Sequence, residues 1–304
     1  MSPMGAEPVL WVNDGLVPAG RGRLDPRDRG FTLGDGLFET MRAGGGGVPW
    51  VDRHLVRLRD GAASIGLPLP WTDGELTDAV VRTLAANGLA DGVVRLTVSR
   101  GTPARRGLLP EDDAKPFLVV HAEPFAGYPP TLYARGLRAI TSQTRRNERS
   151  PLAGLKTLNY LDNVLARREA AAHGADEALL RNTRGYLACA SAANLFLVHG
   201  RTLVTPSIRS GALPGTTRAF VLSELTPRLG LGAVERMVRA GELFAADEAF
   251  LTNALIGVLP LTVVDGRPVG SGQPGPVTTE LGAALSESWS LLVSRGAAEP
   301  GQSV

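Results

Sequence analysis

Apolar residues recur at helical spacing in two segments of the first third of the chain. Between Asp52 and Ile65 they fall on one face of a helix, and Gly66 ends the pattern. A second apolar stripe follows Thr72 and Glu75, which are spaced as a capping box, and it ends at Gly88. Alternating or continuous short apolar runs predict strands at Val9–Val12, Leu37–Met41, Val94–Val98 and Phe117–Val120, with a turn at Gly44–Gly47.

A stretch rich in proline and glycine, residues 123–130, interrupts this pattern and predicts a linker. Beyond it we expect strands at Arg135–Thr141, Glu177–Arg181, Asn194–Val198, Thr202–Val204 and Ala249–Thr252, and helices at Leu158–His173, Thr217–Leu225 and Val277–Val293. Strands and helices mix without strict alternation, which favours an α+β fold of two domains over one doubly wound sheet. The predicted parts are a small α/β domain (1–122), the linker (123–130), a larger domain (131–296) and a disordered tail (297–304).

Composition excludes several classes of protein. The 304 residues carry a net charge of +2, from 32 basic and 30 acidic residues, and no basic run of the kind that nucleic-acid binding requires. A single cysteine, Cys189, forbids an intrachain disulfide and is typical of a reducing compartment. No run of 18 apolar residues and no secretory signal pattern occurs, so we expect a cytoplasmic protein that does not cross a membrane.

Lysine is rare, with only Lys115 and Lys156 among the 32 basic residues. Lys156 lies among apolar residues between a turn-forming Ser-Pro pair and the predicted helix. An apolar site lowers a lysine pKa, and a neutral amine can attack a carbonyl to form a Schiff base. A solvated lysine at a helix start is the alternative reading.

Two further segments suit an anion. Thr216 and Thr217 open a predicted helix after a glycine-rich turn, where free N–H groups can bind phosphate, although they also suit plain helix caps. Arg57 shares a helix face with His54 and is either a phosphate ligand or a surface residue. A dinucleotide fingerprint is absent at Gly34–Gly36, a phosphate loop is excluded by Arg149, and no metal site is predicted.

Six blocks in order resemble the fold-type IV pyridoxal-phosphate (PLP) enzymes, the class IV aminotransferase family, over about residues 8–290. The blocks are RGFTLGDGLFETMR (29–42), HLVRL (54–58), LKTLNYLDNVLARREAAAHGADEALL (155–180), ANLFLVHGRTLVTP (193–206), GALPGTTR (211–218) and FLTNALIGVLPL (250–261). The resemblance implies a small α/β domain, a larger pseudo-barrel domain that binds the cofactor, PLP in the cleft between them, and a homodimer.

The resemblance also implies roles for single residues. Lys156 matches the lysine that holds PLP as a Schiff base and later moves the α-proton. Phosphate contacts are implied for Arg57, Thr216, Thr217 and Thr252, and a contact with the phenolic oxygen of PLP for Tyr160.

Within the family, the blocks GDGLFETMR and LTNALIGVLP are most similar to the 4-amino-4-deoxychorismate lyases. The segment SRGTPARRG (99–107) resembles a lyase segment with one residue inserted, so either Arg105 or Arg106 is expected to bind a substrate carboxylate. The expected reaction eliminates pyruvate from 4-amino-4-deoxychorismate to give 4-aminobenzoate, a step of folate biosynthesis. An aminotransferase acting on a branched-chain or D-amino acid is the alternative.

Cys189 departs from the family pattern. The family has a glutamate five residues before the asparagine of its N-[LIV]-F block, here Asn194, and that glutamate pairs with the pyridine nitrogen of PLP. A neutral thiol is a weak partner for that nitrogen, so the ring is expected to accept electrons poorly. Three readings follow: a lyase that tolerates a weaker electron sink, a family member with different chemistry, and a protein that has lost catalysis.

Overall fold

The computed structural model describes residues 7–110 and 115–298 and divides the chain into two compact units. Unit 1 takes its described residues from 1–126, 156–159 and 290–304, and unit 2 consists of 127–155 and 160–289. The first boundary between the two units, at residues 126 and 127, falls inside the linker predicted at residues 123–130. Lys156 lies in the smaller unit 1, whereas the sequence prediction assigned it to the larger domain.

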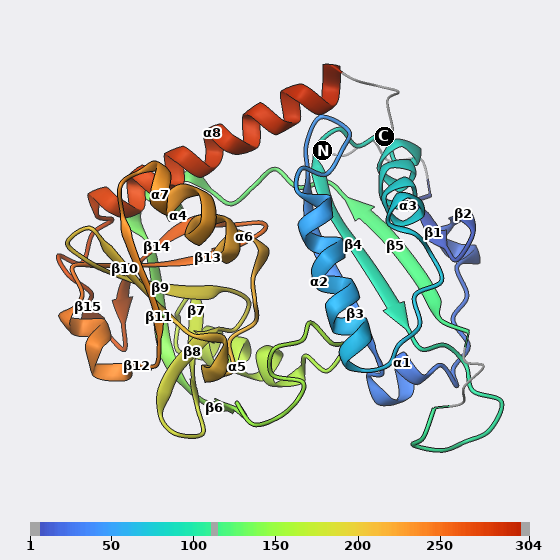
Figure 1. Ribbon diagram of the computed structural model, residues 1–304, viewed down its shortest axis with the longest axis horizontal. Helices are drawn as coiled ribbons and strands as arrows, with labels where there is room; N and C mark the ends of the chain where they lie inside the picture. Colours follow the sequence, from blue (N-terminus) through green and yellow to red (C-terminus); the bar gives the residue numbers. More distant parts are fainter. Residues whose placement is uncertain (1–6, 111–114, 299–304) are drawn as a thin grey trace. The chain divides into compact units, whose positions relative to one another are not determined.

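Unit 1 is built on a five-stranded sheet in the order β2-β1-β5-β4-β3 (Figure 1). All its neighbouring strands within this order run antiparallel. Its elements are β1 (Val9–Val12), β2 (Gly15–Pro18), η1 (Ala19–Arg21), α1 (Arg29–Leu33), β3 (Gly36–Ala43), α2 (Val51–Ser64), α3 (Asp73–Ala86), β4 (Gly92–Ser99) and β5 (Phe117–Glu123).

The two long helices of unit 1 bury the apolar faces that the sequence pattern indicated. Leu55 and Leu58 of α2 and Leu76 of α3 pack with Val94 and Leu96 of β4 in one core. Thr72 and Glu75 form the predicted capping box of α3. The predicted turn is also present, because Gly44 and Gly47 exchange backbone hydrogen bonds.

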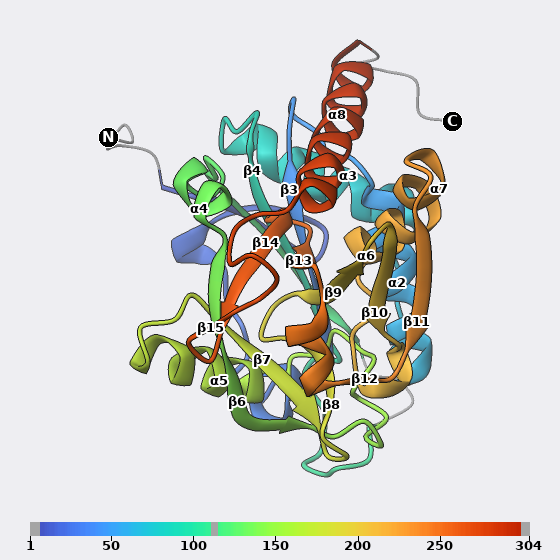
Figure 2. The same ribbon diagram turned by 90° about the vertical axis from the view of Figure 1, so that its left-hand side faces the viewer.

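Unit 2 is dominated by a ten-stranded sheet in the order β11-β10-β9-β13-β14-β6-β7-β8-β12, with β15 paired to β14. Figure 2 shows its strands, with α5 beside β6 and β7. Its elements are α4 (Pro130–Arg135), β6 (Leu137–Arg146), α5 (Leu161–Ala172), β7 (Glu177–Asn182), β8 (Tyr186–Ala190), β9 (Asn194–His199), β10 (Thr202–Pro206), η2 (Ile208–Ser210), α6 (Thr216–Phe220), the π-helical η3 (Val221–Leu225), α7 (Thr226–Arg228), β11 (Gly232–Arg236), β12 (Val238–Arg239), η4 (Ala240–Ala245), β13 (Glu248–Asn253), β14 (Gly257–Val264), β15 (Arg267–Pro268) and α8 (Pro276–Ala298), which continues into unit 1.

The large sheet curls into a nearly closed pseudo-barrel, and its inward-facing leucines form the core of unit 2. Leu179, Leu197 and Leu251 are fully buried there. A second, smaller cluster lies beneath α5 and contains Ala166, Ala170 and Cys189. The predicted α+β class with a small sheet and a larger pseudo-barrel is therefore confirmed.

Several predicted element boundaries were wrong, among them those of α5, β6 and α8. The helix expected from Leu158 begins only at Leu161, because the residues before it pair with β3. The strand expected from Arg135 begins at Leu137, because Pro130 starts the short helix α4. Helix α8 extends to Ala298, so it includes the first two residues of the predicted tail, and residues 299–304 lie outside the described residues. Along the described chain, no helix is both long enough and apolar enough to span a membrane.

Candidate active site

Lys156 is held on a short extended segment that docks against the beginning of β3. The backbone N–H of Phe38 donates to the carbonyl of Lys156 over 3.0 Å, and the N–H of Leu158 donates to the carbonyl of Gly36 over 3.0 Å. Leu37 and Thr157 form the antiparallel bridge between these bonds. Lys156 is therefore fixed by a sheet-like contact with a strand more than a hundred residues earlier in the sequence.

The surroundings of the Lys156 amine favour its neutral form. Nζ lies 4.1 Å from the centre of the Phe38 ring, and the guanidinium carbon of Arg95 lies 3.7 Å from the same ring centre. Burial lowers the pKa of Lys156 from 10.5 to about 7; Arg57 and Arg95 contribute in the same direction, and Glu39 opposes them. An amine with this pKa is substantially unprotonated at neutral pH and can act as a nucleophile or a base.

Arg57 belongs to a buried ionic cluster between β3 and α2. Its Nε donates to Oε1 of Glu39 over 2.8 Å and its Nη2 to Oε2 over 2.5 Å, while Nδ1 of His54 lies 2.7 Å from Oε2. Burial alone would raise the pKa of Glu39, but Arg57 and His54 outweigh burial and lower it from 4.5 to about 2. Glu39 therefore stays ionised and fixes the direction of the Arg57 guanidinium.

Arg105 and Arg106 are exposed on the irregular segment that follows β4. Neither residue belongs to the Glu39 cluster. The structure thus brings Lys156 and Arg57 into one electrostatic environment and leaves the two predicted substrate arginines on a separate surface segment of unit 1.

In unit 2, Thr252 and the start of α6 meet through Asn194. Thr252 on β13 pairs with Asn194 on β9, and Nδ2 of Asn194 donates to the carbonyl of Leu213 over 2.8 Å. A Cβ at Gly215, the residue that precedes α6, would collide with Oδ1 of Asn194, so glycine permits this close approach. Three of the predicted phosphate residues, Thr216, Thr217 and Thr252, are thereby gathered on one side of unit 2.

The buried hydroxyl of Thr252 suggests a ligand nearby. Thr252 is 1% exposed, and its Oγ1 has no hydrogen-bond partner among the described residues. A buried hydroxyl without a partner is costly, and native structures keep such groups mainly where a ligand or water satisfies them. Gly215 gives α6 no side-chain cap, so the N–H groups of Thr216 and Thr217 also suit an anion.

Cys189 is a neutral, buried thiol. It lies on β8 opposite Leu180 of β7 and packs against Ala166 and Ala170 of α5. Burial raises the pKa of Cys189 from 9.0 to about 11; Glu177 contributes to the increase and Arg146 opposes it. Tyr160 is partly buried and immediately precedes α5.

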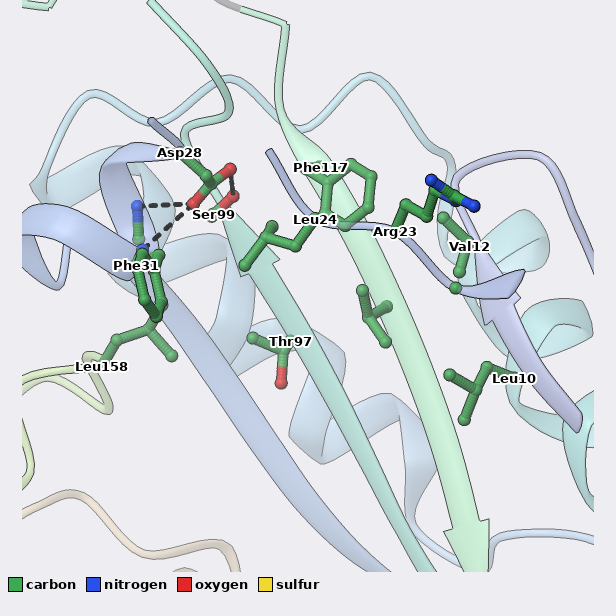
Figure 3. Close-up of a pocket in the computed structure, with 13 residues that line it drawn as sticks. Leu10, Val12, Arg23, Leu24, Asp28, Phe31, Thr97, Ser99, Phe117 and Leu158 are labelled. Atoms are coloured by element: carbon green, nitrogen blue, oxygen red, sulfur yellow. Dashed lines mark hydrogen bonds between the residues drawn. The ribbon is translucent and has the colours of Figure 1, made fainter. Parts of the chain in front are cut away.

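A cavity of about 520 Å³ lies on the face of the small sheet that α2 and α3 leave uncovered (Figure 3). Leu10, Thr97, Phe117 and Leu158 are among its lining residues, and Asp28 accepts a hydrogen bond from Ser99 at one end. None of the site residues predicted from the sequence lines this cavity. It is therefore not the candidate active site.

Sequence reasoning missed three residues around Lys156: Phe38, Glu39 and Arg95. Glu39 alternates with Leu37 and Met41 on the buried face of β3. A single acid on an otherwise apolar strand face is a signal of a buried cationic partner, and this signal was available in the sequence. Phe38 and Arg95 carried no such signal, because their role arises from the docking of a distant segment.

Comparison with known proteins gives a matching family model and similar proteins. The family model described as "Amino-transferase class IV" matches residues 36–264, which include Lys156, Arg57 and all the residues gathered in unit 2. A putative branched-chain-amino-acid aminotransferase of Methanocaldococcus jannaschii is 35% identical over 90% of this chain and 93% of its own length.

Two solved structures extend the comparison. The structure of 4-amino-4-deoxychorismate lyase from Pseudomonas aeruginosa is similar with a TM-score of 0.81 and 35% identity, covering 91% of this chain and 98% of the other. The branched-chain aminotransferase from the thermophilic archaeon Thermoproteus uzoniensis, solved with norvaline, has a TM-score of 0.86 at 30% identity, covering 95% of this chain and 96% of the other.

Proposed function

The chain belongs to the class IV aminotransferase family of PLP-dependent enzymes, and we propose that it is the lyase that eliminates pyruvate from 4-amino-4-deoxychorismate to give 4-aminobenzoate. Similarity to the Pseudomonas aeruginosa lyase supports this choice within the family. The observation that carries it is the neutral thiol of Cys189, at the position where the family resemblance implies an acid.

The residues present suit the aldehyde and the phosphate of PLP. Lys156 offers an amine with a pKa near 7 for the PLP aldehyde. Arg57 and the N–H groups at the start of α6 suit the phosphate, and the unsatisfied Oγ1 of Thr252 is the kind of donor that a phosphate oxygen would use. We assign Tyr160 to the phenolic oxygen and Cys189 to the ring nitrogen.

PLP supplies an aldehyde that binds the substrate amine and a ring that withdraws electrons from the α-carbon. Lys156 would hold the cofactor through Nζ and, with substrate bound, would take the α-proton on the same atom. Its low pKa suits both tasks, because each requires the neutral amine. Arg57, fixed by Glu39, holds the phosphate, and Arg105 or Arg106 binds a substrate carboxylate.

Cys189 favours elimination over transamination. With a pKa of about 11 the thiol carries no charge at neutral pH, so it stabilises a protonated ring nitrogen poorly. Elimination would make a brief demand on the cofactor as an electron acceptor, because the C–O bond to the enolpyruvyl group breaks as Lys156 takes the α-proton. The group leaves as enolpyruvate, which gains a proton to become pyruvate, and the carbon ring of the substrate becomes aromatic. Transamination would demand more of the cofactor as an electron acceptor, which an uncharged thiol supports poorly.

A branched-chain or D-amino-acid aminotransferase is the second candidate, and the 35% identity to the Methanocaldococcus protein favours its branched-chain form. A family member that binds PLP without turnover is the third candidate, because it also accounts for Cys189.

We further propose that the protein is a cytoplasmic homodimer. Sedimentation of the purified protein at twice the chain mass of 31.9 kDa is the expected result.

Absorption and product analysis test the proposed function together. The purified protein incubated with PLP should be yellow, and a Lys156→Ala variant should lose the visible band. With 4-amino-4-deoxychorismate, pyruvate should be released without any keto-acid acceptor. Turnover that depends on a keto-acid acceptor would identify a transferase. A yellow protein that shows neither pyruvate release nor acceptor-dependent turnover would support the third candidate.

A further inference from the structure

A buried charge cluster joins the beginning of β3 to the loop that carries Arg105 and Arg106. Oδ2 of Asp35 accepts a hydrogen bond from Nε of Arg29 and another from Nε of Arg100, each over 2.8 Å. Both arginines are 5% exposed. One carboxylate cannot satisfy two buried guanidiniums, so their remaining N–H groups require other acceptors.

Arg29 finds its other acceptors in the loop that follows β4, residues 101–110. Its Nη1 donates to the carbonyl of Gly107 and its Nη2 to the carbonyl of Leu108, each over 2.8 Å. Its backbone N–H donates to the carbonyl of Gly101 over 2.9 Å. One residue therefore holds both the beginning and the middle of this loop, on either side of Arg105 and Arg106.

Apolar packing contributes little to the position of the loop. No helix or strand forms between residues 101 and 110, and Leu108 and Leu109 are 82% and 87% exposed. Hydrogen bonds from the Arg29 side chain to the carbonyls of Gly107 and Leu108 consequently fix this part of the loop against the rest of the described residues of unit 1.

The residues beside Arg29 and Asp35 are themselves held by several hydrogen bonds. Oδ1 of Asp28 caps α1 by accepting from the N–H groups of Gly30 and Phe31, and its Oδ2 accepts from Ser99, as Figure 3 shows. Arg100 donates to the carbonyls of Ile65 and Gly66, at the C-terminal end of α2. The loop is thus tied through Asp35 to the helix that carries Arg57.

We propose that Arg29 is a positioning residue that holds Arg105 and Arg106 in place for substrate binding, with Asp35 directing its guanidinium. The functional half of this inference rests on the proposed function, in which one of these two arginines binds a substrate carboxylate. The anchoring half does not, because it concerns only the order of the loop.

Trypsin measures the anchoring directly, since it cleaves after arginine and needs a locally unfolded segment. Loss of two hydrogen bonds from a charged donor should increase the rate of cleavage after Arg105 and Arg106 by about tenfold or more in Arg29→Gln. Arg27→Gln is the matched control, because Arg27 lies two residues away, is exposed and pairs only with Asp25 among the described residues. Its cleavage rate should equal that of the wild type.

Arg29→Lys covers the possibility that Arg29→Gln does not fold, as judged by circular dichroism. Lysine keeps the charge beside Asp35 but cannot reach both carbonyls, so cleavage should accelerate in the same direction and by a smaller factor. An unchanged cleavage rate in the folded variants would overturn the anchoring.

Kinetics of the PLP-loaded enzyme test the positioning. KM for the substrate should rise about tenfold in Arg29→Gln while kcat and the visible absorption of the cofactor change little. Faster cleavage with an unchanged KM would overturn the positioning role. In a protein without lyase or transferase turnover, the cleavage rates still decide the anchoring, so failure of the proposed function is distinguishable from failure of this inference.

Discussion

Single buried side chains set the charge state of the candidate site, and Glu39 is the clearest case. Its pKa of about 2 in the folded protein lies below the ordinary value of 4.5. Because the folded pKa is depressed, its contribution to stability is fully present above pH 4.5 and is lost as the pH falls from 4.5 towards 2. The shift corresponds to about 3 kcal/mol, as an order of magnitude.

Replacement of Glu39 should remove this pH dependence. We expect Glu39→Gln to lower the free energy of unfolding by about 3 kcal/mol at pH 7, because Arg57 and His54 lose a buried partner. The difference from the wild type should shrink as the pH falls from 4.5 towards 2. Urea unfolding at several pH values measures it, and a constant difference over that range would contradict the assigned pKa.

Cys189 allows a second prediction at the scale of one residue. A glutamate in its place should strengthen the electron sink, so Cys189→Glu should increase the single-turnover rate of keto-acid formation from an amino acid about tenfold or more. Cys189→Ser, which adds no charge, is the control and should leave the rate low. Equal rates in the two variants would show that position 189 does not act on the ring.

At the scale of elements, local signals predicted structure well and distant pairing did not. The capping box of Thr72 and Glu75 was predictable because both partners lie within one helical turn. The helix α5 was predicted to begin at Leu158 instead of Leu161, because β3, the strand that pairs with the segment Lys156–Leu158, is far away in the sequence. The close approach of Gly215 to Asn194 could not be predicted either, because the two residues lie on separate elements of the sequence.

The capping box of α3 supplies a prediction about stability. Thr72→Ala removes the side-chain acceptor for the backbone N–H of Glu75 and should cost about 1 kcal/mol of unfolding free energy. Thr77→Ala lies inside the same helix and should be neutral or slightly stabilising, since alanine is the better helix former. Thermal unfolding of both variants makes the comparison, and equal melting temperatures would refute the role of the cap.

At the scale of the whole molecule, the chain passes between the two units four times, near residues 126, 155, 159 and 289. The break that composition suggested at residues 123–130 is thus only one of several crossings. The two crossings that flank Lys156–Asn159 were unpredictable because this segment joins unit 1 through backbone pairing with β3, which leaves no mark on local composition.

A fragment of residues 1–126 should therefore be incomplete. It lacks the segment that pairs with β3, so we expect a low melting temperature and weak cooperativity by circular dichroism. A synthetic peptide of residues 155–160 should raise the melting temperature, and a peptide with the same residues in scrambled order should not. A fragment that melts cooperatively without any peptide would contradict this expectation.

The pairing of β6 with β14 has a consequence for the order of events during synthesis. These strands are parallel neighbours, with Ala139 opposite Val264. On the ribosome, β6 emerges well before its neighbour, so the barrel cannot close until nearly the whole chain has been made. The newborn protein must keep the edge of β6 from pairing elsewhere during that interval, which makes translation speed and chaperone access determinants of its yield.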